Sequence, residues 1–236
     1  MTENIPNRSG DPFTTDDESQ ILNTIDRWLE KDVKDKVLAL DHADEYPTQM
    51  VEQMKSLGLF GATISQRYGG LGMPSASYAK VVTAVSEVWM SLTGIFNSHL
   101  IMAAAVERFG TEEQRQRFLP KFATGEIRGG LALTEPSCGT DLQAIRTKAH
   151  KDGDHYVING AKTWISNGIQ GDCVALLVKT DTEIQPRHKG MSLFLAEKGP
   201  GFSVGPKLKK LGYKGIDSAE LFFDDYVIAA NNLIGG

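Results

Sequence analysis

Two short segments of the chain carry residue types that could bind a flat molecule with an anionic tail. Residues 130–141 form a short apolar run that leads into hydroxyl, carboxylate, proline and glycine residues. Such a turn leaves backbone N–H groups unpaired beside a hydroxyl, which suits an anionic oxygen such as that of a diphosphate. Residues 162–167 resemble a strand that ends in the indole of Trp164 and the hydroxyl of Ser166. Because an indole packs against flat rings and a hydroxyl can donate to a ring nitrogen, the two segments predict a strand-built site.

Composition limits the classes of protein that the chain can represent. Its 236 residues are 41% hydrophobic and 23% charged, as in a globular protein of one large or two ordinary domains. The net charge of −5 argues against nucleic acid, because the one basic cluster (Lys207, Lys209, Lys210) is small. No apolar run approaches the ~18 residues that cross a bilayer, so we expect no membrane span. The acidic N-terminus resembles neither a signal nor a transit peptide, and two cysteines are too few for a disulfide framework or a zinc site. A reducing cytoplasm fits best.

The predicted secondary structure changes from helices to strands near Gly125. Nine of the 24 glycines fall in residues 1–125 and fifteen in residues 126–236, and only the first part shows helical periodicity. We therefore predict an α+β fold. Its parts are a tail (1–14), an all-α N-terminal domain (15–125) and a small β-barrel domain (126–236).

Helix signals in the first part are specific. We expect helices from Thr15, from Pro47 to Gly58, from Ser75, from about Leu92 to Phe109, and from a capping box at Thr111 to Pro120. Strands in the second part are predicted at 131–133, 145–150, 156–158, 163–165, 174–179, 191–196 and 219–223. Asp152-Gly153 and Asn159-Gly160 are dipeptides typical of tight hairpin turns.

Residue by residue, 132–141 resembles the first signature of the acyl-CoA dehydrogenase family, which runs small-apolar-Thr/Ser-Glu-x-x-small-Gly-Ser/Thr-Asp. Trp164-Ile165-Ser166-Asn167 is similar to the family's flavin-facing segment at a similar spacing. Two matched blocks are far more specific than one glycine motif. The family often has Thr at Ser166 and Gly-Ala at Ser137-Cys138. The resemblance covers residues 15–236.

The resemblance implies FAD as the cofactor. Thr134 would bond the pyrimidine side of the flavin ring, Thr140 would reach the diphosphate, Trp164 would cover the ring and Ser166 would donate to N5. The implied set of cofactor-binding residues is Leu131, Leu133, Thr134, Gly139, Thr140, Trp164, Ile165 and Ser166.

The resemblance also implies a substrate, an acyl-CoA whose α-proton is taken by a carboxylate and whose β-hydrogen passes to the flavin. Thr140 would border this substrate. Arg187, His188 and Lys189 could meet the CoA nucleotide, although a merely solvated loop fits them equally well. For Glu135 and Asp141 we favour a turn-stabilising role, and for His99 a place in the core.

The catalytic glutamate is expected beyond Gly236, in a further helical domain that members of the family carry there. We therefore expect a fragment or one half of a split enzyme that acts with an electron-transfer flavoprotein and forms a homo-oligomer when complete. Two alternatives stay open: a catalytically inactive remnant that acts as a binding module, and an acyl-CoA oxidase.

Overall fold

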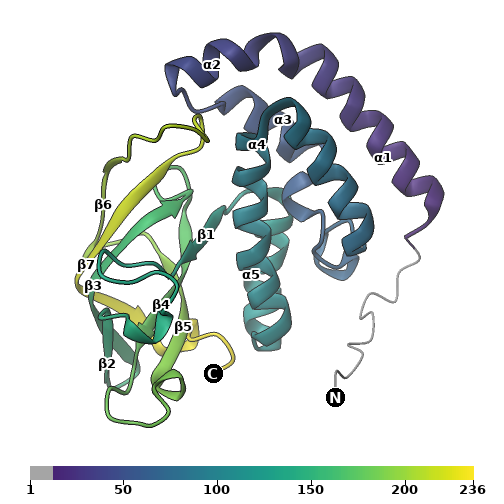
Figure 1. Ribbon diagram of the computed structural model, residues 1–236. Coiled ribbons are helices and arrows are strands. Elements are labelled where there is room, and N and C mark those ends of the chain that lie inside the picture. Colours follow the sequence, from purple (N-terminus) through teal and green to yellow (C-terminus); the bar gives the residue numbers. More distant parts are fainter. Residues whose placement is uncertain (1–12) are drawn as a thin grey trace.

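The structure, a computed structural model that describes residues 13–236, places an α-helical part beside a curled β-sheet (Figure 1). The last α-helix ends at Thr124 and the first strand begins at Gly129, with the predicted boundary in the connection between them. The predicted α+β fold class is confirmed. The sheet is an open half-barrel, since no strand pairing among the described residues joins its two ends. The predicted tail lies outside the described residues except for its last two residues.

From residue 13 onward, the first part contains five α-helices: α1 (Thr15–Trp28), α2 (Val37–Ala43), α3 (Thr48–Ser56), α4 (Ser75–Phe109) and α5 (Glu112–Thr124). α1 begins where predicted because Thr14 and Asp17 form a capping box. α3 follows Pro47, and the chain then turns at Gly58 with φ 73°. The sequence analysis did not predict α2.

α4 contains both helices that were predicted between residues 75 and 109. Trp89 interrupts it with extended backbone angles (φ −158°, ψ 103°), and the Trp89 indole donates to Asp41 at 3.1 Å. By length and composition alone α4 is apolar enough to cross a membrane. However, 61% of its most apolar window is buried inside the protein, as is common for a central core helix.

α5 starts at the predicted capping box of Thr111 and Gln114 but does not end at Pro120. It continues to Thr124 and stops at Gly125, whose φ of 72° favours glycine. The prediction was wrong because burial of Phe118 and Phe122 on either side of the proline outweighs one lost backbone hydrogen bond.

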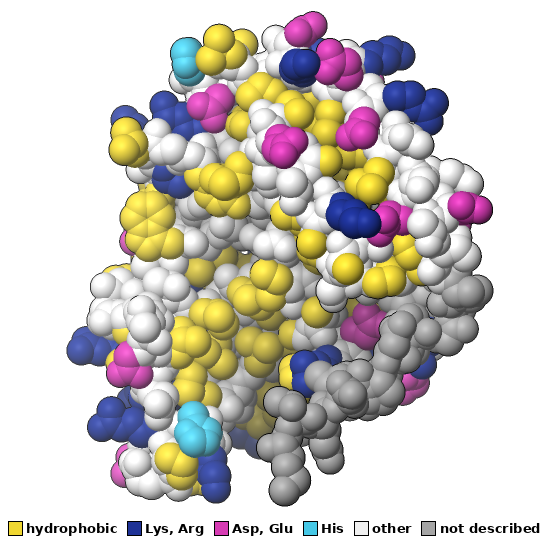
Figure 2. Space-filling view, turned by 45° about the vertical axis from the view of Figure 1, so that its right-hand side comes forward, with side chains coloured by type: hydrophobic (Ala, Val, Ile, Leu, Met, Phe, Trp, Pro, Cys, Tyr) yellow, Lys and Arg dark blue, Asp and Glu magenta, His cyan; other side chains and the backbone are white. Residues whose placement is uncertain are grey.

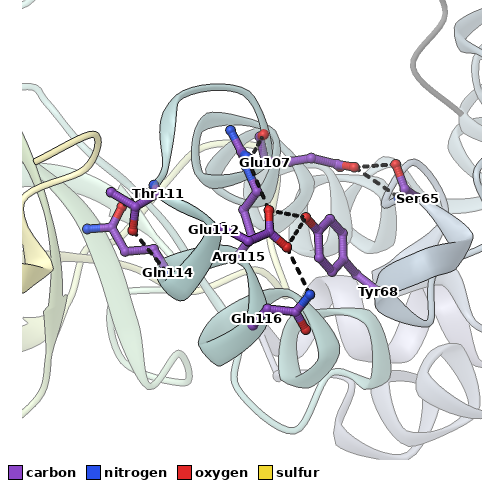
Figure 3. Close-up of polar contacts among 8 residues, drawn as sticks. All are labelled: Ser65, Tyr68, Glu107, Thr111, Glu112, Gln114, Arg115 and Gln116. Carbon is purple, nitrogen blue, oxygen red and sulfur yellow. Dashed lines mark hydrogen bonds and ion pairs between the residues drawn. The ribbon is translucent and has the colours of Figure 1, made fainter.

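Polar side chains also fix the junction of α4 and α5 (Figure 3). The Tyr68 hydroxyl donates to Glu112 at 3.1 Å, and Arg115 donates to the Glu107 carbonyl at 2.9 Å. The same junction is tied to the segment that follows the last strand, because the Gln114 amide donates to the carbonyls of Asn231 and Leu233, each at 2.7 Å.

In the part of the chain that the structure describes, seven strands form one sheet: β1 (Gly129–Ala132), β2 (Lys148–Asp152), β3 (His155–Ser166), β4 (Cys173–Lys179), β5 (Met191–Glu197), β6 (Phe202–Lys207) and β7 (Ser218–Ala229). On one side β4 pairs with β5. On its other side β4 pairs first with β1 and, at its far end, with β2. β3, β7 and β6 follow in that order. β6 was not predicted.

One hairpin prediction is confirmed and the other is wrong. β2 and β3 pair as a hairpin closed at Asp152 and His155, as the Asp152-Gly153 dipeptide indicated. Asn159-Gly160 instead lies inside β3, where the register to β7 shifts, so the strands predicted at 156–158 and 163–165 are one long strand. Glycine is needed there because a Cβ on Gly160 would lie 2.5 Å from the Thr147 hydroxyl oxygen.

The loop between β6 and β7 connects the two parts of the molecule. Lys207 forms an ion pair with Asp44 at 2.7 Å, and the Gly215 N–H donates to the same carboxylate at 2.9 Å. Between these two residues, the Tyr213 hydroxyl lies against α4 at Gly94, where a Cβ would be only 1.7 Å away. These contacts hold the sheet beside α4.

Candidate functional site

The two segments singled out in the sequence lie side by side in the sheet. β1 pairs with the first half of β4, and β2 reaches β4 only at the pair Lys148–Lys179. Residues 133–147 therefore connect β1 and β2, which pair one after the other with the same side of β4. The Thr163 N–H donates to the Thr134 carbonyl at 2.9 Å, which joins this connection to β3.

A buried ion pair fills the break between β1 and β2. Lys162 is 0% exposed, and its Nζ lies 2.8 Å from Glu135 Oε1 and 3.0 Å from the Leu133 carbonyl oxygen. The Glu135 carboxylate also accepts from the N–H groups of Arg146 (2.6 Å) and Thr147 (3.0 Å), at the approach to β2. Glu135 thus holds the two ends of the connection together, in the turn-stabilising role that we favoured.

These contacts also determine the charge of Glu135. Burial by itself would raise the pKa of its carboxyl group. The hydrogen bonds from Lys162, Thr147 and Arg146 outweigh burial and leave the pKa below its usual value. Glu135 is therefore an ionised structural carboxylate. The sequence analysis did not single out Lys162, although a lysine inside a strand that leads into a candidate motif was a usable signal.

The end of β3 presents an indole and a hydroxyl. Trp164 has φ 61° and lies at a register shift between Lys162 and Ile165, and 57% of its surface is exposed. Ser166 is half-buried, whereas Ile165 is 2% exposed and packs in the sheet core. Any contribution of Ile165 to a ligand site is thus limited to its backbone. Trp164 and Ser166 fit one face of a flat ring and one ring nitrogen.

The turn after β1 offers hydrogen-bond donors for an anion. Glu135 and Cys138 exchange two backbone hydrogen bonds, at 2.9 and 3.1 Å, which close the turn. Gly139 and Thr140 follow on the surface, and within residues 13–236 their N–H groups donate to no other group. Free N–H groups beside a free hydroxyl are what a diphosphate requires. Leu131, Leu133 and Thr134, at the other end of this segment, are half-buried.

For two remaining candidates, the described residues show no contact that assigns them a ligand. His188 is exposed on the turn Arg187–Gly190 between β4 and β5, and among the described residues no hydrogen bond joins it to the site segments. Asp141 is exposed and caps the short turn at residues 142–144 by accepting from the Gln143 N–H.

His99 is a core residue, as we favoured. It is 0% exposed, its Nε2 lies 3.0 Å from the Phe122 carbonyl oxygen, and its ring packs edge-on against Phe60 and Phe122. Burial lowers the pKa of His99 to about 4. The histidine is therefore neutral at physiological pH and has no access to solvent.

The two parts together define a class of protein: a helical domain beside a curled sheet that carries a candidate strand-built site. Residues 15–126 match the family model "Acyl-CoA dehydrogenase, N-terminal domain", and residues 130–226 match "Acyl-CoA dehydrogenase, middle domain". The chain belongs to the acyl-CoA dehydrogenase family.

Known relatives agree with this assignment. Mitochondrial isovaleryl-CoA dehydrogenase of Pongo abelii is 33% identical over 225 residues, which are 94% of this chain and 53% of the relative. Butyryl-CoA dehydrogenase of Megasphaera elsdenii superposes with a TM-score of 0.89 at 31% identity, over 96% of this chain and 60% of that one. An acyl-CoA dehydrogenase of Bacillus anthracis complexed with FAD has a TM-score of 0.84 at 29% identity, over 95% and 38% of the two chains. The chain thus spans about half the length of the curated relatives that it matches.

Proposed function

We propose that this chain binds FAD and an acyl-CoA as part of an acyl-CoA dehydrogenase that introduces an α,β double bond into the thioester. The observation that carries the proposal is the joined pair of site segments, with Trp164 and Ser166 at the end of β3 beside the turn after β1. Family membership and the FAD complex of a relative support it.

The residues present fit FAD. Trp164 offers an exposed indole for one face of the ring, and Ser166 and Thr134 offer hydroxyls for its polar edge. The free N–H groups of Gly139 and Thr140 suit the diphosphate. When bound, FAD supplies the electron acceptor for the dehydrogenation. The protein's part is to orient the ring, to donate hydrogen bonds at Ser166 and Thr134, and to keep water from one face.

For the base we propose a carboxylate outside these 236 residues. Glu135 is already occupied by Lys162 and two backbone N–H groups, and Asp141 caps a surface turn. Neither is free to take an α-proton. Abstraction of this proton by a positioned base is worth roughly 10²–10⁴-fold in rate, so a chain without one would turn over very slowly.

An acyl-CoA at Thr140 and His188, an electron-transfer flavoprotein as acceptor and a homo-oligomeric state remain parts of this proposal. One structure with the same fold is described as an electron-transferring flavoprotein of Acidaminococcus fermentans. The cytoplasmic location expected from two free cysteines also remains a prediction.

An anaerobic titration tests the proposal. The purified chain is loaded with FAD, and flavin absorbance is followed while a panel of acyl-CoAs is added. We expect FAD to bind and acyl-CoA to perturb its spectrum without bleaching it. Bleaching should appear when the other half of a family member is supplied as a second polypeptide. Bleaching by the chain alone would place the base within residues 1–236, and failure to bind FAD would refute the proposed site.

A further inference from the structure

The exposed end of β3 is anchored on both sides by buried side chains. Before Trp164, the Lys162 ammonium donates to the Leu133 carbonyl at 3.0 Å. After Ser166, the Asn167 amide donates to the Gly129 carbonyl at 2.9 Å. Lys162 is 0% exposed and Asn167 is 1% exposed. The two carbonyls lie at the start of β1 and just beyond its end, so one strand anchors both ends of the segment.

The anchored segment has a backbone conformation that its sequence does not favour. Trp164 and Asn167 have φ values of 61° and 60°, and the register to β7 shifts between Lys162 and Ile165. Asparagine tolerates this left-handed region, but a bulky residue such as tryptophan does not. Strained residues of this kind persist only where surrounding contacts hold them, and they cluster at functional sites.

We propose that Lys162 and Asn167 are positioning residues that hold Trp164 and Ser166 in the pose that receives the flavin ring. Neither residue is expected to touch the ligand. Lys162 holds the chain before the register shift in β3, and Asn167 holds the chain after Ser166. Asn167 also donates to the Ile95 carbonyl of α4 at 2.9 Å. The pose of the indole is thus set jointly by β1 and by the helical part. This inference rests on the proposed flavin site.

Glu135 has a separate part in the arrangement. Its charge balances the Lys162 ammonium in a place from which water is excluded. Removal of Lys162 alone would leave a buried carboxylate without its counter-charge and destabilise the whole domain. The informative variant therefore changes both residues. In Glu135→Gln/Lys162→Met the glutamine oxygen can still accept a backbone N–H, while the bond from the Lys162 side chain to the Leu133 carbonyl is lost.

The first arm of the test uses the flavin-free chain and compares this double variant with Asn167→Gly, which keeps a positive φ accessible and changes no charge. Lys151→Met, at an exposed lysine of β2, is the matched control. Backbone couplings and amide exchange are read by NMR at Thr163 and Trp164. We expect the φ of Trp164 to become negative in the double variant and in Asn167→Gly. In the double variant we also expect the Thr163 amide to exchange about tenfold faster than in the parent, which is the effect of one lost hydrogen bond. An unchanged φ at Trp164 in both variants would overturn the proposal. Should the double variant fail to fold, Asn167→Gly decides.

The second arm adds FAD to the same proteins. We expect the FAD dissociation constant to rise about tenfold in both site variants. The quenching of flavin fluorescence by the indole and the visible circular dichroism at saturation should also change, whereas a merely structural role would leave the saturated spectra as in the parent. Parent spectra and affinity in both variants would overturn the positioning role. If the parent itself does not bind FAD, the proposed function fails, and the flavin-free arm still decides whether the two residues set the pose of Trp164.

Discussion

The backbone N–H of Thr163 lies 2.9 Å from the carbonyl oxygen of Thr134, so two motifs 29 positions apart are directly hydrogen-bonded. Thr134 opens the turn that offers free N–H groups, and Thr163 precedes the exposed indole of Trp164. The single bond places the turn that we propose for an anion beside the surface that we propose for a flat ring. The bond falls at the register shift between Lys162 and Ile165, where β3 departs from its pairing with β7.

Replacement of Ser166 by alanine should weaken flavin binding without unfolding the protein. One hydrogen bond to the ring is lost, worth about 0.5–1.5 kcal/mol net. The measurements are the FAD dissociation constant and the reduction potential of the bound flavin. Ser203→Ala, at an exposed serine of β6, is a suitable control. Affinity and potential equal to those of the parent would remove Ser166 from the site.

Trp164→Gly should separate stability from binding. Glycine adopts φ 61° without the roughly 1–2 kcal/mol cost that a left-handed conformation imposes on other residues. Because the indole is 57% exposed, its removal gives up little core packing. We expect a free energy of unfolding equal to or above that of the parent in urea titrations, together with a clear loss of FAD affinity. Marked destabilisation would show that Trp164 is a packing residue.

Acid should destabilise the helical part through His99. Burial lowers its pKa from 6.5 to about 4, so between these values the unfolded chain binds a proton that the folded chain does not. Stability is therefore complete above pH 6.5 and decreases as pH falls toward 4, by up to about 3 kcal/mol. Urea unfolding at a series of pH values measures the slope.

His99→Gln should flatten this slope, because glutamine can donate to the Phe122 carbonyl but does not titrate in this range. His150→Gln, at an exposed histidine of β2, should leave it unchanged. An equal slope in parent and His99→Gln would show that other groups determine the acid sensitivity.

The chain as it stands should bind hydrophobic dyes and associate with itself. Three large apolar side chains of α4 are exposed, Met90 by 53%, Ile101 by 46% and Phe109 by 60%, and Leu211 is fully exposed at 100%. Figure 2 shows hydrophobic side chains gathered above and below a hollow in the middle of one face. Contiguous apolar surface of this kind favours association. In sedimentation experiments Met90→Lys/Ile101→Lys should shift the protein toward monomer. A monodisperse parent that binds no dye would contradict the prediction.

The sequence by itself determined the features that depend on neighbours along the chain. The capping boxes at Thr14 and Thr111, the Asp152-Gly153 hairpin and the change from helices to strands near Gly125 follow from local hydrogen bonding and periodicity. The two motifs were also readable, because residue types such as indole, hydroxyl and glycine carry their chemistry with them.

Tertiary structure decided whatever depends on partners far away in the chain. Asn159-Gly160 is a turn dipeptide by local preference, but pairing of β3 with β7 on both sides of it keeps it inside a strand. Pro120 would end an isolated helix, yet buried phenylalanines carry α5 past it. In the sequence Lys162 stands in a strand that leads into a motif, but nothing near it along the chain shows which charge it meets. A buried charge is tolerated only where a counter-charge and a backbone acceptor meet it. For Lys162 these are Glu135 and the Leu133 carbonyl, which lie 27 and 29 positions away in the sequence, so only the fold brings them together.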